Sequence, residues 1–129
     1  MPRIDVAVPD IPQPLANYAP ARRAGDFVFV SGASGRQADG SLAAGVGAQT
    51  EATLARIADA LGDHGCALAD VVEAQIFLVD MADYAAMNAV WNRIFADKAR
   101  FPARTTVAAR ALPQPDLLVE IRAVAWKRA

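Results

Sequence analysis

The chain has 129 residues, enough for one domain with a substantial hydrophobic core and no disulfides. Its net charge is −1 at pH 7, which argues against a nucleic-acid or membrane surface. The only cysteine is Cys66 and the only histidine is His64, so an internal disulfide is excluded and a zinc site is disfavoured. We therefore expect a single domain over residues 1–129 without a metal site. With no leader pattern and no long apolar run, we also expect it to be cytoplasmic.

The first twenty residues contain five prolines, which predicts an irregular strap that ends near Tyr18. The apolar run Phe27 to Ser31 predicts a strand, paired in a hairpin with Ala19 to Arg23 across a turn at Gly25-Asp26. The glycine-bearing loop at residues 32–41 has neither the dinucleotide fingerprint nor the P-loop spacing, so a phosphate site is not expected there.

The first predicted helix runs from Val46 to Leu61 and ends at Gly62. His64 follows directly, and a position at a helix end favours a structural over a catalytic role for it. Residues 70–79 are rich in β-branched side chains and predict a strand that is largely buried on both faces. One face of the helix should be apolar and consists of Thr50, Leu54, Ile57, Ala58 and Leu61.

A second helix is predicted from Tyr84 to about Lys98, with a capping segment at Asp80 to Asp83. Asn88 is a polar residue within the apolar face of this helix. It is either a core amide with satisfied hydrogen bonds or part of a pocket. The other members of this face are Tyr84, Met87, Trp91, Ile94 and Phe95.

Two strands are predicted near the C-terminus, joined by a proline-bearing loop at residues 112–116 that is unsuited to a tight hairpin turn. Arg104 opens the first strand, and Glu120 lies in the second. Side chains alternate in the second strand, so Glu120 shares a face with Leu118, Val124 and Trp126. A carboxylate there is costly unless it is paired or used. Glu120 either pairs with Arg122 or meets water, or it forms an Arg–Glu site for an anionic substrate and its water.

The order of elements is β β α β α β β, which predicts an α+β domain. Its sheet should be mixed and mainly antiparallel, with both helices packed on one face. The other face would be bare and apolar, which favours a homo-oligomer with sites shared between subunits.

The chain resembles the Rid (YjgF-like) reactive-intermediate deaminases over nearly its whole length. The resemblance rests on Tyr18 followed by the strand ending Val30-Ser31-Gly32, on Asn88, on Pro102-Ala-Arg104-Thr, and on Leu118 to Ala125. The segments Arg23 to Gly32 and Arg104-Thr-Thr-Val, with the later Leu112-Pro-Gln-Pro115, are most similar to the 2-aminomuconate deaminase branch.

This resemblance implies a chorismate-mutase-like fold and a homotrimer, with three sheets forming a central barrel and sites between subunits. It also implies the cofactor-independent hydrolysis of an imine or enamine to a carbonyl compound and ammonia. Arg104 would bind the substrate carboxylate, and Glu120 would orient and deprotonate water. Tyr18 and Ser31 would line the pocket, and Asn88 would fix the pocket wall or the substrate.

Two positions depart from the family pattern. Ala33 stands where many members have glutamine, and Thr106 stands where some have cysteine. Both changes would reshape the pocket. A dicarboxylate such as 2-aminomuconate would need a second cation, and we consider Arg36 first and Arg110 second for that role. Arg36 is otherwise a solvated loop charge.

Three other functions are considered. A carboxylate-binding or regulatory trimer without turnover would need Arg104 but not Glu120. An endoribonuclease or translation inhibitor would need a basic surface and a histidine pair, and the sequence has neither. A role in holding unfolded chains would rest on apolar surface alone.

Overall fold

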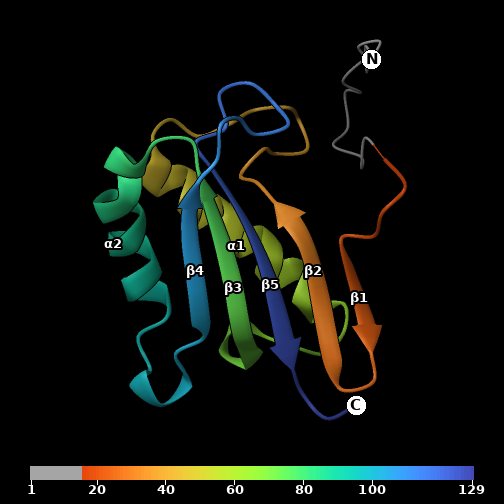
Figure 1. The fold of residues 1–129 in the computed structure, drawn as a ribbon. Coiled ribbons are helices and arrows are strands. Elements are labelled where there is room, and N and C mark those ends of the chain that lie inside the picture. The colour runs from red at the N-terminus through yellow and green to blue at the C-terminus, as the bar shows by residue number, and fades with distance from the viewer. Residues whose placement is uncertain (1–15) are drawn as a thin grey trace.

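The computed structural model describes residues 16–129, so the greater part of the predicted N-terminal strap, residues 1–15, lies outside the described residues. The elements follow the predicted order (Figure 1). Three short 3-10 turns, at Leu68–Asp70, Met81–Asp83 and Lys98–Arg100, lie between them. The strands and helices are β1 (Ala21–Ala24), β2 (Phe27–Ala33), α1 (Val46–Gly62), β3 (Val71–Leu78), α2 (Tyr84–Ile94), β4 (Ala103–Ala108) and β5 (Val119–Trp126).

The five strands form one sheet in the order β1-β2-β5-β3-β4. Only β3 and β4 run parallel, and the other three pairs are antiparallel. Helix α1 lies behind the sheet in Figure 1. Helix α2 packs against α1 and lies beside the β4 edge of the sheet. The predicted α+β fold, with a mixed, mainly antiparallel sheet and helices on one face, is confirmed. The C-terminal strands β4 and β5 are not neighbours, because β3 lies between them.

The hydrophobic core lies between the sheet and the helices. Strand β5 contributes every second residue to it, as the alternating pattern predicts. Each aliphatic side chain buried in this way contributes about 1.5–3 kcal/mol. The following core side chains are no more than 2% exposed: Val28, Val30, Leu54, Ile57, Leu61, Ile76, Leu78, Met87, Val119 and Ile121.

Strand β3 is not buried on both faces, and that prediction is wrong. Ala74, Ile76 and Leu78 face the core, whereas Val72 on this strand is 45% exposed. The helices cover only one face of the sheet, so the other face of β3 stays open within a single chain.

Helix α2 ends at Ile94, four residues earlier than predicted. Phe95 leaves the helical conformation with φ −97° and ψ 70°, and its ring stacks on that of Trp91 at a centroid distance of 4.2 Å. Asp97 then caps the next short turn by accepting a hydrogen bond from the Ala99 N–H. Ring stacking and this new cap replace the last predicted turn of the helix.

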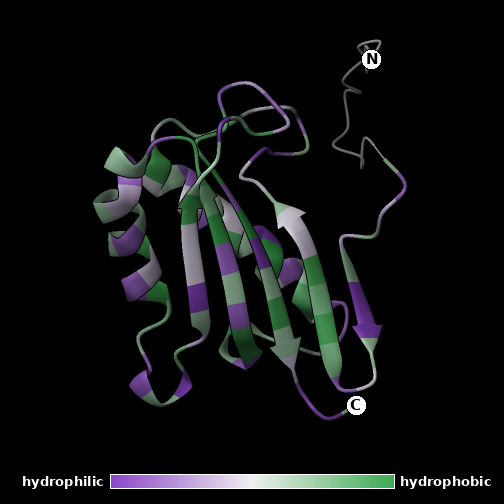
Figure 2. Cartoon of the chain, viewed as in Figure 1, coloured by the Kyte–Doolittle hydropathy of each residue, from purple (hydrophilic) through white to green (hydrophobic). Residues whose placement is uncertain are grey.

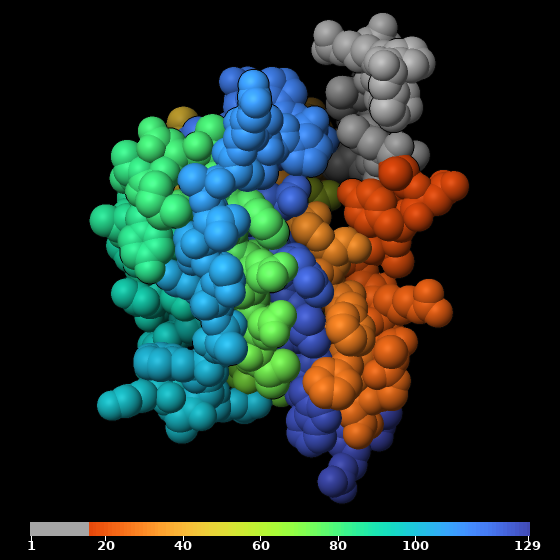
Figure 3. All heavy atoms as spheres, in the orientation of Figure 1, coloured from red at the N-terminus to blue at the C-terminus, as the bar shows by residue number. Residues whose placement is uncertain are grey.

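The open face of the sheet is apolar where the start of β2 lies beside the end of β5. Phe27, Phe29 and Trp126 are each 43% exposed, and the strand register places Phe27 opposite Trp126. In Figure 2 most of β2 is hydrophobic, and Figure 3 shows the side chains of this face with no helix across them. A large exposed apolar sheet face is typical of a protein–protein interface.

Two long loops, residues 34–45 and 109–118, are tied to α1 by the Gln49 side chain. Gln49 is 3% exposed. Its Nε2 donates to the carbonyls of Ala43 and Asp116 at 3.1 and 3.2 Å, and its Oε1 accepts from the Leu118 N–H at 2.8 Å. One buried amide therefore satisfies three main-chain groups from two loops.

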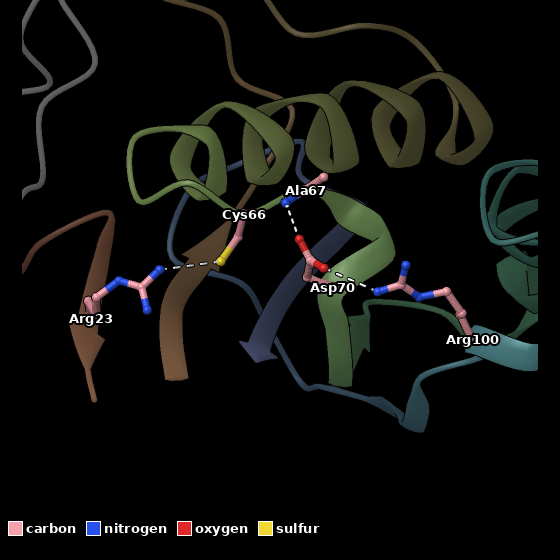
Figure 4. A network of polar contacts seen from close by, with 5 residues as sticks. All are labelled: Arg23, Cys66, Ala67, Asp70 and Arg100. Carbon is pink, nitrogen blue, oxygen red and sulfur yellow. Dashed lines mark hydrogen bonds and ion pairs between the residues drawn. The ribbon is translucent and has the colours of Figure 1, made fainter. Parts of the chain in front are cut away.

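Polar contacts also hold the other end of α1 (Figure 4). Arg23 of β1 donates to the carbonyl of His64 and lies 3.7 Å from the sulfur of Cys66. Asp70 accepts from the Ala67 N–H at 2.8 Å and pairs with Arg100 at 3.1 Å. His64 thus follows the helix in a turn, as predicted, and its main-chain carbonyl takes part in this contact.

We expect Gln49→Ala to lower the free energy of unfolding by about 2–3 kcal/mol, because a buried N–H and two carbonyls lose their partner. Urea unfolding followed by circular dichroism measures this loss. Glu51→Ala is the matched control on the same helix. It breaks only the exposed ion pair with Arg93 and should cost less than about 1 kcal/mol. Equal losses in the two variants would contradict the role of Gln49.

Candidate functional site

Arg104 lies on the helix-covered side of the sheet. In the parallel β3–β4 register it stands opposite Ala74, whose side chain is buried against the helices. Its guanidinium carbon is 5.0 Å from the ring centroid of Trp91 and 5.6 Å from that of Tyr84. Its Nη2 donates a hydrogen bond to the Tyr84 hydroxyl at 3.1 Å. Two aromatic rings of α2 therefore hold this cation at the sheet edge.

Tyr84, Asn88 and Trp91 are spaced four and three residues apart, so they share one face of α2. The Asn88 amide and the positive charge of Arg104 together hold the pKa of Tyr84 below its ordinary value. The Oδ1 atom of Asn88 is buried and has no partner among residues 16–129. Asn88 is thus not the fully satisfied core amide that the sequence left open.

A pocket of roughly 280 Å³ opens between α2 and the start of β4. Thr106 lies two residues beyond Arg104 on the same side of β4, opposite the buried Ile76. Its Oγ1 is the second buried polar atom without a partner in the described part of the chain. A ligand or a water in this region could supply the missing hydrogen bonds. The residues that line the pocket are Asn88, Trp91, Asn92, Phe95, Phe101, Pro102 and Arg104.

Glu120 lies on the open face of the sheet, opposite Phe77 of β3. It is half-buried, and this burial raises the pKa of its carboxyl above the ordinary value. The ion pairs found among residues 16–129 do not include Glu120. Arg122 points instead to Gln75, with its Nη1 3.4 Å from the amide oxygen. The Glu120–Arg122 pair that the sequence allowed is therefore not formed.

Gly32 of β2 leaves room for the Glu120 carboxylate. A Cβ atom at this position would lie 2.8 Å from Glu120 Oε2, closer than real contacts allow. A register shift between Val30 and Ala33 accompanies this approach of the two strands. Glycine therefore allows the carboxylate to lie against the backbone of β2.

Ser31 fixes the segment that carries Tyr18. Its hydroxyl donates to the Ala19 carbonyl at 2.6 Å, and its N–H donates to the Pro20 carbonyl at 2.9 Å. The Tyr18 side chain is exposed just before this anchor. Ser31 thus has a clear structural role, and its hydroxyl oxygen keeps lone pairs that can accept a further hydrogen bond.

The Arg36 guanidinium donates hydrogen bonds to residues of both long loops. Its Nε donates to Gln114 Oε1 at 3.0 Å, and its Nη1 and Nη2 donate to the carbonyls of Gly40 and Pro115 at 3.1 and 2.8 Å. Arg110 is exposed in the loop after β4, and Ala33 is the last residue of β2. Arg36 is therefore a link between two loops rather than a solvated charge.

The two principal site residues do not meet within one chain. Arg104 is on β4 and faces α2, Glu120 is on β5 and faces away from the helices, and β3 separates the two strands. The candidate site residues therefore form two separate groups in the described chain, which we call candidate half-sites. The first contains Arg104, Tyr84, Asn88, Trp91 and Thr106, and the second contains Glu120, Gly32, Ser31 and the neighbouring Tyr18 segment.

No site role was predicted for Tyr84, Trp91 or Gly32 from the sequence. The spacing of Tyr84 and Trp91 around Asn88 was a usable signal, since all three share one helix face. Gly32 carried no signal of its own, because only the strand register brings it to Glu120. Residues 16–129 contain no group of three His, Cys, Asp or Glu side chains arranged to hold a metal, and no described helix is long and apolar enough to span a membrane.

The chain matches known proteins both in sequence and in fold. The family model described as Endoribonuclease L-PSP matches residues 9–127. The 3-aminoacrylate deaminase RutC of Acinetobacter baylyi is 37% identical over 127 residues, covering 97% of this chain and 98% of that protein. The 2-iminobutanoate/2-iminopropanoate deaminase of Escherichia coli is 29% identical over 125 residues, covering 95% and 97%. The crystal structure of the Escherichia coli YjgF gene product superposes with a TM-score of 0.83 at 27% identity, covering 98% and 100%.

The fold is thus that of the YjgF-type proteins. The chain belongs to the Endoribonuclease L-PSP family, the Rid (YjgF-like) proteins that its sequence resembles.

Burial of Glu120 has a consequence for stability that depends on pH. Because the pKa is raised in the folded protein, the ionised carboxylate disfavours folding, and stability falls as pH rises from the ordinary value of 4.5 through the raised value. Glu120→Gln should therefore stabilise the protein at about pH 8, with the gain vanishing near pH 4. Urea unfolding at both values tests this expectation.

The control for this experiment is Glu73→Gln, since Glu73 is an exposed carboxylate on β3. Its effect on stability should be small and should change little between the two pH values. A gain for Glu120→Gln that is larger at low pH would contradict the raised pKa.

Proposed function

We propose that this protein is a cofactor-independent deaminase that hydrolyses imine or enamine carboxylates to a carbonyl compound and ammonia. The observation that carries the proposal is the pair of candidate half-sites, with the cation of Arg104 on one face of the sheet and the partly buried carboxylate of Glu120 on the other. Deaminase activity is also the activity by which two similar relatives are named. The reaction needs both a cation for the substrate and a base for water.

The two half-sites would join across subunits of a homotrimer. Arg104 of one subunit would lie against Glu120 of the next, in a cleft between them. The exposed apolar face formed by Phe27, Phe29 and Trp126 supports this assembly, because burying it requires another protein surface. Within the cleft, Tyr18, Ser31, Asn88 and Thr106 would line the substrate-binding region.

In the reaction, Arg104 would bind the substrate carboxylate through N–H groups that have no acceptor among residues 16–129. Glu120 would remove a proton from a water molecule as the water oxygen attacks the electrophilic C=N carbon. The carbinolamine formed from the protonated imine would accept that proton on nitrogen. Its C–N bond would then break as Glu120 takes the hydroxyl proton, which leaves a carbonyl, ammonia and the proton that the imine had carried. One water is consumed and one ammonia is released. A raised pKa places Glu120 closer to neutrality, where a carboxylate can both accept and return a proton.

The substrate is proposed to be a small monocarboxylate, such as a 2-imino acid, in preference to the dicarboxylate 2-aminomuconate. Arg36, first considered as a second cation, has donors bound to Gln114, Gly40 and Pro115. Arg104 is the one cation that lines the described pocket. Arg110 is the remaining candidate for a second carboxylate. Monocarboxylates also appear in the names of the two relatives.

An endoribonuclease activity, suggested by the family name, is less well supported. Acid–base cleavage of RNA commonly uses histidine, and the single histidine of this chain is His64. His64 is held by Arg23 of β1, at the sheet edge opposite to β4 and Arg104. A binding protein without turnover would not need the desolvated Glu120.

The test is ammonia release from 2-imino acids generated in place, with 2-aminomuconate assayed alongside. Arg104→Ala should lower kcat/KM by about a hundredfold or more, because a charged hydrogen-bonded contact to the carboxylate is lost. Arg100→Ala, which breaks only the ion pair with Asp70, should retain activity. Folded wild-type protein that releases no ammonia from either substrate would refute the deaminase proposal.

Sharing of the site between subunits has its own test. Arg104→Ala and Glu120→Ala chains, each inactive alone, are co-expressed with different tags, and assemblies carrying both tags are isolated. A mixed cyclic trimer contains two chains of one variant and one chain of the other. In both cases, one of its three interfaces pairs an intact Arg104 with an intact Glu120. About a third of wild-type activity should therefore return. Doubly tagged Arg104→Ala assemblies are the control and should stay inactive. Absence of any recovery in the mixed assemblies would place the site within one chain.

A further inference from the structure

Tyr84 contacts the site cation. It is the first residue of α2, and its hydroxyl accepts a hydrogen bond from Arg104 Nη2 at 3.1 Å. Its ring lies 5.6 Å from the guanidinium carbon. The phenol therefore offers Arg104 both a hydrogen-bond acceptor and an aromatic surface.

The Tyr84 hydroxyl does not need Arg104 in order to have a hydrogen-bond partner. Tyr84 is 40% exposed, so water could satisfy its hydroxyl. Arg104 would also keep a ring contact without it, because Trp91 lies 5.0 Å from the guanidinium carbon. What the hydroxyl adds is direction, since a hydrogen bond at one nitrogen restricts rotation of the planar guanidinium.

The hydrogen bond to Tyr84 leaves the other nitrogens of the Arg104 guanidinium, Nε and Nη1, available to a ligand. The bond to Tyr84 uses Nη2, and the structure records no acceptor for Nε or Nη1 of Arg104 among residues 16–129. A carboxylate prefers two parallel N–H donors in a fixed plane. A long, flexible arginine loses rotational freedom when it adopts such a geometry, and holding it in advance lowers that cost.

The electrostatics of Tyr84 agree with this geometry. The Asn88 amide and the charge of Arg104 hold the pKa of Tyr84 below its ordinary value, because both groups lie close to its oxygen and stabilise negative charge there. Asn88, whose buried Oδ1 has no partner among residues 16–129, lies on the same helix face and is a lining residue of the pocket, as is Arg104. Tyr84 and Asn88 thus form one polar edge beside the cation.

We propose that Tyr84 is a positioning residue that orients Arg104 to receive the substrate carboxylate. The proposal rests on the deaminase function proposed above. It assigns Tyr84 no contact with the reacting carbon, so its effect should fall on substrate binding rather than on the chemical step.

The test is steady-state ammonia release by Tyr84→Phe, which keeps the ring and removes only the hydroxyl. KM should rise about three- to tenfold, while kcat stays within about twofold of wild type. Ser41→Ala is the control, because it removes an exposed hydroxyl that bonds Asp39 in a distant loop, and both constants should be unchanged. An unchanged KM in Tyr84→Phe, or a fall confined to kcat, would overturn the proposal.

Inhibition by product analogues separates positioning from a general change in the pocket. Pyruvate carries the carboxylate that Arg104 would bind, whereas pyruvamide has the same carbon skeleton without the negative charge. In Tyr84→Phe, inhibition by pyruvate should weaken by the same factor by which KM rises, and inhibition by pyruvamide should not change. Equal weakening of both would show a merely structural effect and overturn the proposal. If wild type neither releases ammonia nor binds pyruvate, the proposed function fails, independently of Tyr84.

Discussion

The register of β3 against its two neighbours is the constraint on which the site depends. Ala74 of β3 stands opposite Arg104 of β4, and Phe77 stands opposite Glu120 of β5. Since successive side chains of a strand point to opposite faces, these two positions send the cation and the carboxylate to different sides of the sheet. A slip of one residue in either pairing would reverse every side chain on the strand that moved.

This separation explains why neither half-site resembles a complete catalytic centre. Arg104 lies between aromatic rings without a carboxylate partner in the described chain, and Glu120 is desolvated without a cation. The partly buried carboxylate of Glu120 is costly in that state, and a ligand or another protein surface could stabilise it. The chain belongs to the Endoribonuclease L-PSP family, in which two similar proteins are named as deaminases.

The sequence predicted what depends on local periodicity. The alternation in β5 gave the buried face correctly, and the helical spacing placed Asn88 and Trp91 together. It failed where a competing contact decides the outcome, as where Phe95 leaves the helix to stack on Trp91. The partners of Arg36 and the opposite orientations of Arg104 and Glu120 depend on loop packing and strand register, which no local pattern reports.

The edge strand β1 has a consequence for how the protein avoids aggregation. It is only four residues long, it carries Arg22 and Arg23, and it is strongly hydrophilic in Figure 2. A short, charged edge is a poor template for the strand of another molecule. Arg23 is also occupied by carbonyls at the end of α1 and near the C-terminus. Pairing of this edge with a strand of another molecule, and with it the sideways growth of the sheet into filaments, is thereby discouraged.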